Sequence, residues 1–335
     1  MPTRSKFYNP STAPYYNPET ERKVAIITGG NSGIGWYTTL HLYLHGYVVY
    51  MAGRTESKVK KAFEDIEKEA KARVAANKDA KSDHVFGELH YIHIDLLDLS
   101  TVPKAVAAFA AAKEEKLDVL INNAGIMGVP YQVTKDDYEI QYQVNFVTHF
   151  LLTLQLVPFL QKTVEAGSTP RIVNLSSIGH NFAYKYFKPE KNKLNAFPNS
   201  IWTWVRYGIA KAAEIQITKE WAIKYPKFLS IAIHPGVILG TNLYDYWRQI
   251  PIIKYPASAI FALSDKVMGV SNEEGSLATL RAAMDPTLNT KQDNGEFLVT
   301  GGIVEKPSKV ASNLEYAKET WDWNIEQLKK RGFDV

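Results

Sequence analysis

The sequence contains no cysteine among its 335 residues. The protein therefore forms no disulfide, has no thiolate nucleophile and builds no cysteine-based zinc site, and this composition suits a reducing compartment. The sequence also lacks a run of about 18 consecutive apolar residues, the length that a membrane-spanning helix needs. The nearest stretch, residues 250–263, is interrupted by Lys254 and Pro256. We expect no membrane-spanning helix.

Clusters of like charge are missing as well. The net charge of +4 arises from 39 basic and 35 acidic residues that are interspersed along the chain. Because nucleic-acid-binding proteins gather basic residues on one surface, we expect no nucleic-acid partner. His41 and His45 share a helix face but lack a carboxylate in a ligand pattern. We expect them to be polar residues on a helix surface and expect no metal site.

The composition indicates one domain with additions. With 45% hydrophobic residues the chain can bury a large core. Residues 1–21 have no apolar run, so they are not a secretory signal, and we expect an arm that lies on the surface. Residues 22–305 form the domain, interrupted by irregular segments at 178–206 and 239–270. Residues 306–335 form a C-terminal helical extension.

Capping patterns predict where three helices begin. They are Thr134-x-x-Asp137, Ser271-x-x-Glu274 and Ser312-x-x-Glu315. The first should open a long helix that carries Asn145 in its interior. The last should open an amphipathic C-terminal helix with one apolar face. The residues expected on that face are Leu314, Trp321, Ile325 and Leu328.

A glycine-rich turn follows the first apolar strand. Residues 24–27 are apolar, residues 28–35 read Thr-Gly-Gly-Asn-Ser-Gly-Ile-Gly, and a helical segment follows as far as Gly46. Glycines allow the backbone to approach a pyrophosphate, and the amides at the start of a helix attract phosphate oxygens. The strand–turn–helix order therefore predicts a dinucleotide site. The contact residues expected there are Gly29, Asn31, Ser32, Gly33, Ile34 and Gly35.

The end of the second predicted strand, residues 47–52, favours one dinucleotide over the other. An NAD enzyme places an acidic residue at this point to hold the ribose hydroxyls. Here Ala52 and Gly53 are followed by Arg54. A guanidinium suits a 2′-phosphate, so we favour NADP(H). The alternative is a solvated arginine at the end of a strand.

Strands continue to alternate with helices along the chain, and this order predicts an α/β fold with a parallel sheet covered on both faces. In such sheets ligands bind outside the carboxyl ends of the strands. Polar segments occupy several predicted strand ends: Asp95-Leu96, Asn122-Asn-Ala-Gly125, Ser176-Ser177 and His234-Pro-Gly-Val237.

The pair Tyr207 and Lys211 is the strongest candidate for a catalytic centre. Residues four apart lie on one face of a helix, so the phenol and the ammonium should project side by side. A nearby positive charge favours the phenolate, which brings the tyrosine closer to the pH at which it can act as a general acid or base. The alternative is an aromatic ring packed under a lysine stem.

These motifs together resemble the short-chain dehydrogenase/reductase family over residues 22–305. The motifs are Thr28-Gly-x-x-x-Gly-x-Gly35, Asn122-Asn-Ala-Gly125, Asn145, Ser177, Tyr207-x-x-x-Lys211 and Pro235-Gly236. The runs at 173–177 and 234–237 are most similar to the retinol dehydrogenase group. Those at 35–38, 41–46 and 300–302 are similar to fungal members found on lipid droplets. The span between Ser177 and Tyr207 is longer than the family's usual one.

The resemblance implies a single Rossmann-type, doubly wound parallel sheet and a nicotinamide-dependent oxidoreductase that acts on carbonyl or alcohol groups. It implies that Tyr207 is the general acid or base, that Lys211 assists it and holds the nicotinamide ribose, and that Ser177 binds the substrate oxygen. Asn145 would anchor a water that carries protons to Lys211. The further cofactor contacts that we expect are Asp95, Leu96, Asn122, Ala124, Gly125, Pro235, Gly236, Val237 and Thr241.

The two irregular segments should border the substrate pocket. Their aromatic and apolar composition predicts an apolar carbonyl or alcohol substrate, such as a lipid-derived aldehyde, a ketone or a retinoid-like molecule. The same residues, with Tyr246, Trp247 and Phe261, could instead touch a lipid droplet or membrane from the cytoplasmic side, or simply pack over the core. The sequence leaves the oligomeric state open, and a homodimer is one alternative, because many relatives pair through helices. The functional alternatives are a non-catalytic NADP(H) sensor and a structural lipid-droplet protein.

Overall fold

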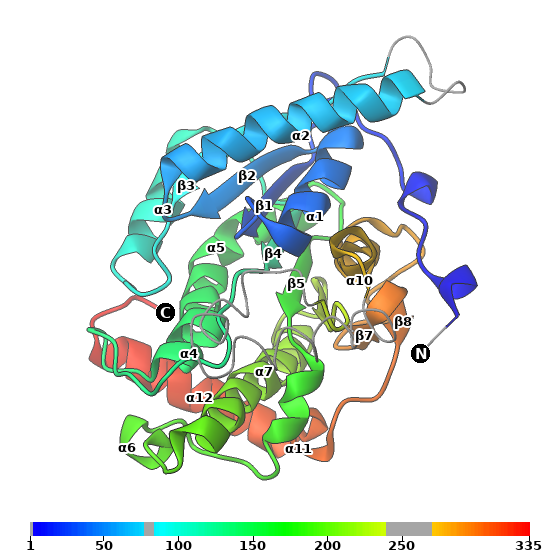
Figure 1. Ribbon diagram of the computed structural model, residues 1–335. Coiled ribbons are helices and arrows are strands. Elements are labelled where there is room, and N and C mark those ends of the chain that lie inside the picture. Colours follow the sequence, from blue (N-terminus) through cyan, green and yellow to red (C-terminus); the bar gives the residue numbers. More distant parts are fainter. Residues whose placement is uncertain (1–2, 77–83, 239–269) are drawn as a thin grey trace.

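The computed structural model describes residues 3–76, 84–238 and 270–335, and their centre is a sheet in the order β3-β2-β1-β4-β5-β6-β7-β8 (Figure 1). Strands β1 to β7 are parallel, and β8 pairs antiparallel with β7. The strands are β1 (Val24–Thr28), β2 (Val48–Gly53), β3 (Glu88–His93), β4 (Val119–Asn122), β5 (Arg171–Leu175), β6 (Leu229–Ile233), β7 (Phe297–Val299) and β8 (Ile303–Val304). The predicted α/β sheet with helices on both faces is confirmed.

Alternation along the strands produces two hydrophobic cores. In β1, Val24 and Ile26 belong to one core, and Ala25 and Ile27 belong to the other. All residues of β1 are buried, as expected of a central parallel strand whose two faces are both covered. The sheet therefore separates two layers of helices.

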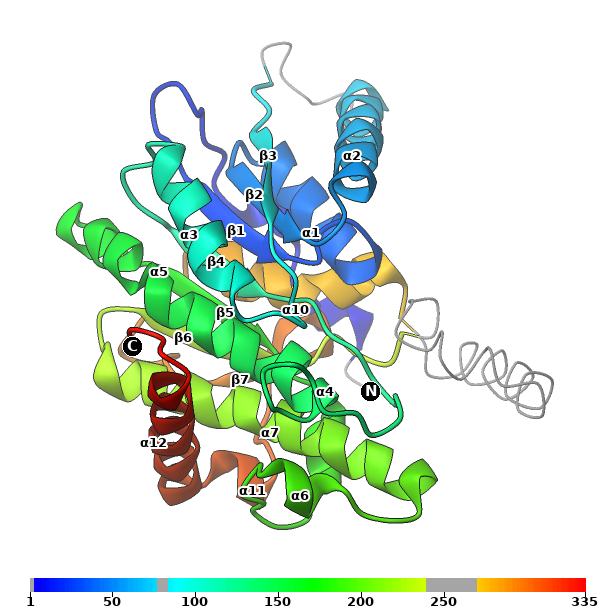
Figure 2. The same ribbon diagram turned by 90° about the vertical axis from the view of Figure 1, so that its left-hand side faces the viewer.

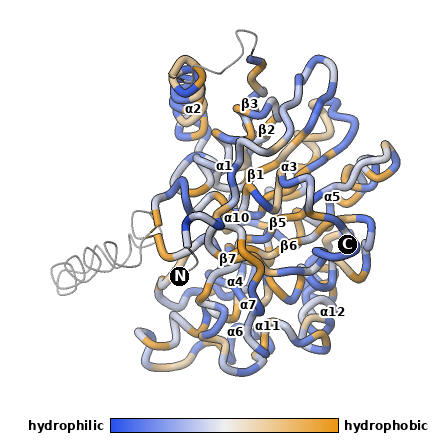
Figure 3. The backbone as a smooth tube through the Cα atoms, turned by 90° about the vertical axis from the view of Figure 1, so that its right-hand side faces the viewer, coloured by the Kyte–Doolittle hydropathy of each residue, from blue (hydrophilic) through white to orange (hydrophobic). Residues whose placement is uncertain are grey.

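The helices of each layer are distinct in Figure 2. One layer holds α1 (Gly33–Leu44), α2 (Glu56–Ala76) and α10 (Asn272–Met284). The other holds α3 (Thr101–Ala111), α5 (Thr148–Glu165) and α7 (Asn199–Lys224). In α2 the buried residues recur at helical spacing, at Val59, Ala62, Ile66 and Ala70, so one stripe packs on the sheet and the rest faces solvent (Figure 3).

The two ends of the chain pack on opposite sides of the domain. The N-terminal arm includes the short helical turns η1 (Arg4–Lys6) and η2 (Pro10–Thr12). It is held by backbone bonds from Tyr8 N to Gly301 O, 2.8 Å, and from Tyr16 N to His45 O, 2.9 Å. Gly301 belongs to the turn η6 (Thr300–Gly302). At the other end, α11 (Lys309–Ser312) leads into α12 (Leu314–Lys330), which packs against α7.

Two of the three predicted helix starts are corrected. The box at Ser271 and Glu274 is confirmed, with both reciprocal bonds present. Thr134 instead bonds the Gln143 side chain, and Asp137 has a φ of 67°, so no helix begins there. The helix begins with α4 (Ile140–Tyr142), which Glu139 caps.

At the C-terminal helix, Asn313 replaces Ser312 as the capping residue, because Ser312 ends α11. Trp321 and Leu328 are buried as predicted, and Ile325 packs at the margin of the core. Leu314 is 55% exposed, because it lies in the first turn of α12.

The segment 178–206 is less irregular than expected. It comprises a helical turn η4 (Ile178–Phe182), a short helix α6 (Lys191–Leu194) and the first turns of α7. The helix that carries Tyr207 therefore begins within this segment. The segment 239–270 lies outside the described residues except for Val270.

Within the part of the chain that the structure describes, one helical span, Ile140–Glu165, is long and apolar enough to cross a membrane by length and composition. However, 78% of its most apolar window is buried inside the protein. It includes α4, a π-helical turn η3 (Gln143–Val147) and α5. Its burial identifies it as a core helix, which is apolar because protein surrounds it.

Candidate active site

The glycine turn, residues 28–35, folds tightly between β1 and α1. Gly29 and Gly33 have φ values of 65° and 54°, which other residues rarely adopt. A Cβ on Gly35 would lie 2.3 Å from the carbonyl oxygen of Gly29, so no side chain fits there. The first amides of α1 therefore stand at an open backbone cradle, an arrangement that attracts phosphate.

A cavity of about 580 Å³ joins this cradle to the carboxyl ends of β4, β5 and β6. It brings all four predicted catalytic residues together with most of the predicted cofactor contacts. The predicted residues that line it are Gly29, Ser32, Gly33, Ile34, Gly35, Ala124, Gly125, Asn145, Ser177, Tyr207, Lys211, Pro235, Gly236 and Val237.

Tyr207 and Lys211 project from the buried part of α7. The Lys211 Nζ atom lies 5.9 Å from the centre of the Tyr207 ring and donates a hydrogen bond to Leu175 O at 2.5 Å. A Cβ on Gly179 would lie 2.7 Å from the Tyr207 ring, so the loop after β5 packs directly on that ring. The two side chains are thereby fixed beside the end of β5.

Burial changes the charge balance at Lys211. Loss of solvent lowers the pKa of its ammonium to about 8, and the carboxylate of Glu214 acts in the opposite direction. Below that pH most Lys211 side chains carry a positive charge. This charge favours the phenolate form of a neighbouring tyrosine.

The two serines at the end of β5 have different environments. Ser176 is buried, and its hydroxyl donates a hydrogen bond to Lys211 O at 2.7 Å, which holds α7 against the sheet. Ser177 is half-buried, and its Oγ accepts a hydrogen bond from Gly179 N at 3.1 Å. Its hydroxyl proton can therefore be donated to a molecule in the cavity.

Asn145 lies in the π-helical turn η3, not in a regular helix interior. Its Oδ1 accepts a hydrogen bond from Ile126 N at 2.7 Å, and its Nδ2 donates to Ile126 O at 2.9 Å. A Cβ on Gly125 would lie 2.6 Å from Asn145 Oδ1 and 3.7 Å from Lys211 Nζ. Asn145 thus holds the loop after β4 close to the lysine.

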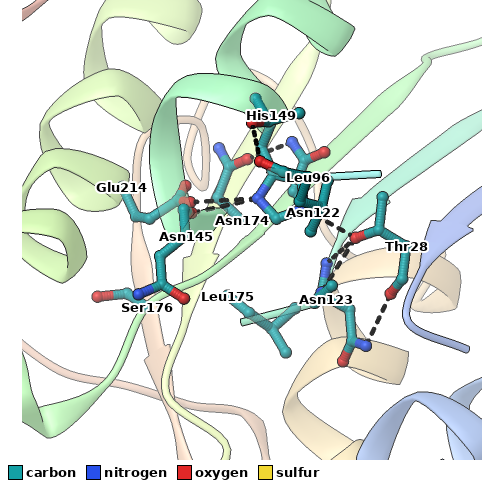
Figure 4. A network of polar contacts seen from close by, with 12 residues as sticks. Thr28, Leu96, Asn122, Asn123, Asn145, His149, Asn174, Leu175, Ser176 and Glu214 are labelled. Atoms are coloured by element: carbon teal, nitrogen blue, oxygen red, sulfur yellow. Dashed lines mark hydrogen bonds and ion pairs between the residues drawn. The ribbon is translucent and has the colours of Figure 1, made fainter. Parts of the chain in front are cut away.

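A partly buried polar network connects the glycine turn to this loop (Figure 4). Thr28 Oγ1 accepts hydrogen bonds from Asn123 N at 2.9 Å and Ala124 N at 3.0 Å, and Asn123 Nδ2 donates to Thr28 O at 2.8 Å. Asn123 thus fixes two strand ends relative to each other. Sequence reasoning had not singled out this asparagine.

Several predicted cofactor contacts do not line the cavity. Asn122 points into the sheet layer, where its Nδ2 donates to Asn174 Oδ1 at 2.8 Å. Asp95 Oδ1 accepts from Leu97 N at 3.0 Å, and Leu96 O accepts from the Thr148 hydroxyl at 2.8 Å. The remaining two, Asn31 and Arg54, are also absent from the cavity lining, and Thr241 lies outside the described residues.

Arg54 nevertheless follows the strand that meets the glycine turn. Gly29 N donates a hydrogen bond to Ala52 O at 3.1 Å, so the end of β2 touches the turn directly. Arg54 stands two residues further on and is exposed. It therefore lies at the margin of the cradle.

The two histidines considered for metal binding are occupied by other contacts. His41 Nε2 lies 3.0 Å from a Glu273 carboxylate oxygen. His45 is buried instead of exposed, because the arm covers it and the Tyr15 ring stacks on it at 4.2 Å. Across residues 3–76, 84–238 and 270–335 no group of three or more histidine, aspartate or glutamate side chains could hold a metal ion.

Comparison with known proteins identifies the family. The short chain dehydrogenase profile matches residues 23–188. The short-chain dehydrogenase/reductase drtF of Aspergillus calidoustus is 32% identical over 331 residues, which cover 95% of this chain and 97% of drtF. The chain belongs to the short-chain dehydrogenase/reductase family. It is therefore an oxidoreductase by family.

Other members of the short-chain dehydrogenase/reductase family are similar over smaller parts or by fold alone. Retinol dehydrogenase 12 of Mus musculus is 35% identical over 232 residues, which cover 67% of this chain and 64% of that protein. The crystal structure of levodione reductase has a TM-score of 0.60 at 19% identity and covers 84% of this chain and 96% of its own. The second comparison supports the fold.

The cavity of this short-chain dehydrogenase/reductase also has lining residues that were not predicted as individual contacts. Asn123, Ser176 and His234 stand inside the quoted motifs, and Phe182 and Trp204 fall in the aromatic segment that was expected to border the pocket. Asn272 and Met127 had no local signal, because their positions depend on how α10 and the loop after β4 pack. The full set is Asn123, Ile126, Met127, Leu175, Ser176, Ile178, Gly179, Phe182, Trp204, His234, Ile238 and Asn272.

Proposed function

We propose that this oxidoreductase interconverts a carbonyl and an alcohol on an apolar substrate and uses NADP(H). The observation that carries the proposal is that the glycine cradle, Ser177, Tyr207 and Lys211 all line the same cavity. A phosphate cradle and a tyrosine–lysine pair in one cavity suit hydride transfer coupled to proton transfer.

The cradle fits a dinucleotide. A Cβ on Gly35 would lie 2.3 Å from the Gly29 carbonyl oxygen, so glycine lets the start of α1 pack directly on the turn, and Gly29, Ser32, Gly33 and Gly35 line the cavity where a pyrophosphate would lie. Gly29, Ser32 and Gly33 would hold that group, and Arg54 would pair with the 2′-phosphate of NADP(H). When bound, the nicotinamide supplies the hydride or accepts it.

The remaining chemistry is assigned to four side chains. In the reductive direction Tyr207 gives its phenolic proton to the substrate oxygen as negative charge grows there. Ser177 donates a hydrogen bond to the same oxygen. Lys211 makes the phenol more acidic through its charge, and Asn145 holds the loop through which a water would reach the lysine.

An apolar substrate is favoured by the side chains at the cavity. Met127, Ile178, Phe182 and Trp204 contribute hydrophobic surface near Ser177 and Tyr207. Retinol dehydrogenase 12, whose name gives an apolar alcohol, is among the relatives. Lipid aldehydes, ketones and retinoid-like molecules are therefore the first candidates.

We further propose peripheral contact with a lipid droplet or membrane. The support is a group of exposed apolar side chains in the same segment as the cavity mouth, with lysines at positions 185, 188, 191 and 193. The exposed side chains are Ile178, Phe182, Tyr184, Phe197 and Ile201. Flotation with phospholipid vesicles tests this, and protein that stays in the dense fraction would refute it.

The decisive assay is oxidation of NADPH in the presence of apolar aldehydes and ketones. We expect turnover by the wild type and a loss of at least about 100-fold in Tyr207→Phe, the scale of general acid–base catalysis. Binding of NADPH should be nearly unchanged, because only one hydroxyl is removed. Equal turnover by the two proteins would remove Tyr207 from the mechanism. A non-catalytic NADP(H) sensor would bind NADPH without turnover, and a structural lipid-droplet protein would show neither.

A further inference from the structure

A buried arginine stands immediately before Tyr207 on α7. Arg206 is 0% exposed, although it does not line the cavity. A guanidinium that has lost its water is costly unless its donors find acceptors and its charge finds a partner. The acceptors of Arg206 therefore show which parts of the chain its side chain holds together.

Two of these acceptors belong to the segment 178–206, which borders the cavity. Arg206 Nη1 donates a hydrogen bond to Leu194 O at 3.3 Å, at the end of α6, and Nη2 donates to Asn199 Oδ1, at the start of α7. Asn199 Oδ1 also accepts from Tyr131 N at 3.2 Å, in the loop after β4. The guanidinium carbon lies 5.5 Å from the centre of the Tyr131 ring. One side chain therefore joins the segment to that loop.

The third contact is an ion pair with Glu139, which caps α4. Arg206 Nε lies 3.5 Å from Glu139 Oε1, and both side chains are 0% exposed. Neither atom has a hydrogen-bond partner among the described residues, so each depends on the opposite charge of the other. The second carboxylate oxygen accepts from Tyr142 N at 2.9 Å. The pair thus fixes the start of α4 against α7.

The parts of the chain that Arg206 joins carry apolar side chains of the cavity lining. Three of these are Met127 of the loop after β4, Phe182 of η4 and Trp204 of α7. The ring centres of Phe182 and Trp204 lie 6.1 Å apart. One residue earlier on α7, the Thr203 hydroxyl donates to Val129 O at 2.7 Å, in the same loop as Met127. A shift of α7 against this loop would therefore change the space between these side chains.

We propose that Arg206 is a positioning residue that sets the shape of the apolar part of the cavity and thereby the preference for bulky substrates. The inference rests on the proposed function, because it concerns how that substrate is bound. The guanidinium contacts lie on the side of α4, α6 and the loop after β4, whereas the glycine cradle is formed by β1 and α1. Arg206 therefore affects binding of the apolar part of the substrate and leaves the cofactor and the proton transfer at Tyr207 unchanged.

The test protein is the double variant Arg206→Met/Glu139→Gln, which removes both charges and keeps side chains of similar size. The amide oxygen at position 139 still accepts from Tyr142 N. Replacing a buried ion pair by side chains of similar volume often leaves stability unchanged, whereas removing one partner alone strands the other. Urea unfolding should therefore show a folded double variant.

The kinetic measurement compares propanal with decanal in NADPH-dependent reduction. Propanal has little apolar surface, while decanal also needs the apolar lining. We expect the KM for decanal to rise at least about tenfold in the double variant, the scale on which hydrophobic pockets discriminate between substrates. The KM for propanal, both kcat values and the Kd for NADPH should change by less than about twofold, because only substrate binding is affected.

Binding of decanol to the NADPH complex gives the same comparison without turnover, since an alcohol cannot accept a hydride. Calorimetry measures this Kd. It should rise at least about tenfold in the double variant, and the Kd of propanol should not.

The matched control is Lys191→Met/Asp137→Asn. It removes another pair of opposite charges between α6 and the loop after β4, but one whose side chains are 37% and 56% exposed. Exposed pairs contribute little, so both aldehydes should behave as in the wild type.

A second set of variants changes the acceptor that Arg206 and Tyr131 share. Asn199→Ala removes this oxygen and should raise the KM for decanal more than that for propanal. Asn199→Asp keeps an oxygen at the same place and should behave as the wild type. If the double variant does not fold, this pair decides the question.

The outcomes separate the two proposals. Equal changes for propanal and decanal would show a general structural role and overturn the inference, and so would an unchanged decanal-to-propanal ratio of KM. Absence of turnover in the wild type with every aldehyde and ketone would refute the proposed function instead. Decanol binding would then still decide whether Arg206 shapes the apolar part of the cavity.

Discussion

Arg54 is the one side chain on which the proposed cofactor preference depends. It follows β2, whose end is bonded to the glycine turn through Gly29 N and Ala52 O. The residues before it, Ala52 and Gly53, offer no carboxylate for ribose hydroxyls. The guanidinium is exposed, so it can pair with a 2′-phosphate without first breaking a buried contact.

Replacement of this arginine should change the cofactor preference. Arg54→Ala removes charge-assisted hydrogen bonds worth about 1.5 to 3 kcal/mol, so we expect NADPH to bind roughly 10- to 100-fold more weakly. NADH, which has no 2′-phosphate, should bind as before. Fluorescence titration with both cofactors measures the ratio, with Lys58→Ala, an exposed lysine in the next helix, as the control. An unchanged ratio in Arg54→Ala would favour the solvated-arginine alternative.

For single residues, the sequence predicts a role in the site where that role depends on local spacing. Tyr207 and Lys211 are four apart on a helix, and the helix alone brings them together. Asn122 is absent from the cavity lining, because strand register places it beside Asn174 and its side chain is bonded there. Glu214 carries no motif, and its burial appears only when α7 packs on the sheet.

At the scale of elements, the C-terminal extension is connected to the active site through His180. The imidazole ring of His180 bonds to both parts. On the side of the extension, its Nε2 accepts a hydrogen bond from Ser308 N at 3.0 Å. The proton must therefore be on Nδ1, which donates to Ser177 O at 2.7 Å. Burial lowers the pKa of this histidine, so the ring stays neutral and keeps both bonds.

Loss of this ring should affect both stability and catalysis. His180→Ala leaves the amide of Ser308 without its acceptor and removes one of the two hydrogen bonds that Ser177 O accepts, so we expect a loss of about 1 to 3 kcal/mol in the free energy of unfolding. Because the backbone of Ser177 loses its hydrogen bond from the His180 ring, the Ser177 hydroxyl is held less precisely, and kcat should fall by a larger factor than KM rises. Urea unfolding and steady-state kinetics measure these effects, with exposed His93→Ala as the control.

The pH dependence has a definite sign. The folded pKa of His180 lies below its ordinary value, so its contribution is present above about pH 6.5 and is lost as pH falls through the folded pKa. His180→Ala should therefore differ from the wild type more at pH 7 than at pH 4. An equal difference at the two pH values would contradict the assigned neutral state.

Element boundaries show where local patterns are sufficient. Ser271 and Glu274 form the predicted capping box because both side chains are available to the backbone. Thr134 has the same local pattern, but its hydroxyl is engaged by Gln143 from the following helix. A partner nine residues away thus overrides the local signal, and no pattern of four residues contains that information.

For the whole molecule, the alternation of strands and helices predicted the sheet, but it did not predict where the C-terminal helix packs. An apolar stripe shows that a helix is buried without showing what covers it. In the structure Trp321 of α12 lies 4.8 Å from the Trp221 ring of α7 and 5.0 Å from the Phe150 ring of α5. Thr320 and Asn324 add hydrogen bonds to Gln216 and Tyr142. The extension therefore packs across α7 and touches α5 through Trp321 (Figure 2).

This packing predicts how the protein behaves in solution. Because α12 packs over Trp221 of α7 and Phe150 of α5, we predict that this part of the surface does not pair with a second copy and that light scattering gives a particle mass near 37.7 kDa. Trp321→Ala removes the ring at the centre of the contact and should cost about 3 to 5 kcal/mol in the free energy of unfolding. It should also raise the average mass with protein concentration, because Trp221 and Phe150 become accessible. The control is Glu319→Ala, which changes an exposed residue of the same helix. It should change the free energy of unfolding by no more than about 0.5 kcal/mol and leave the particle mass as in the wild type. A wild-type dimer that persists on dilution and cross-links through α5 or α7 would contradict this arrangement.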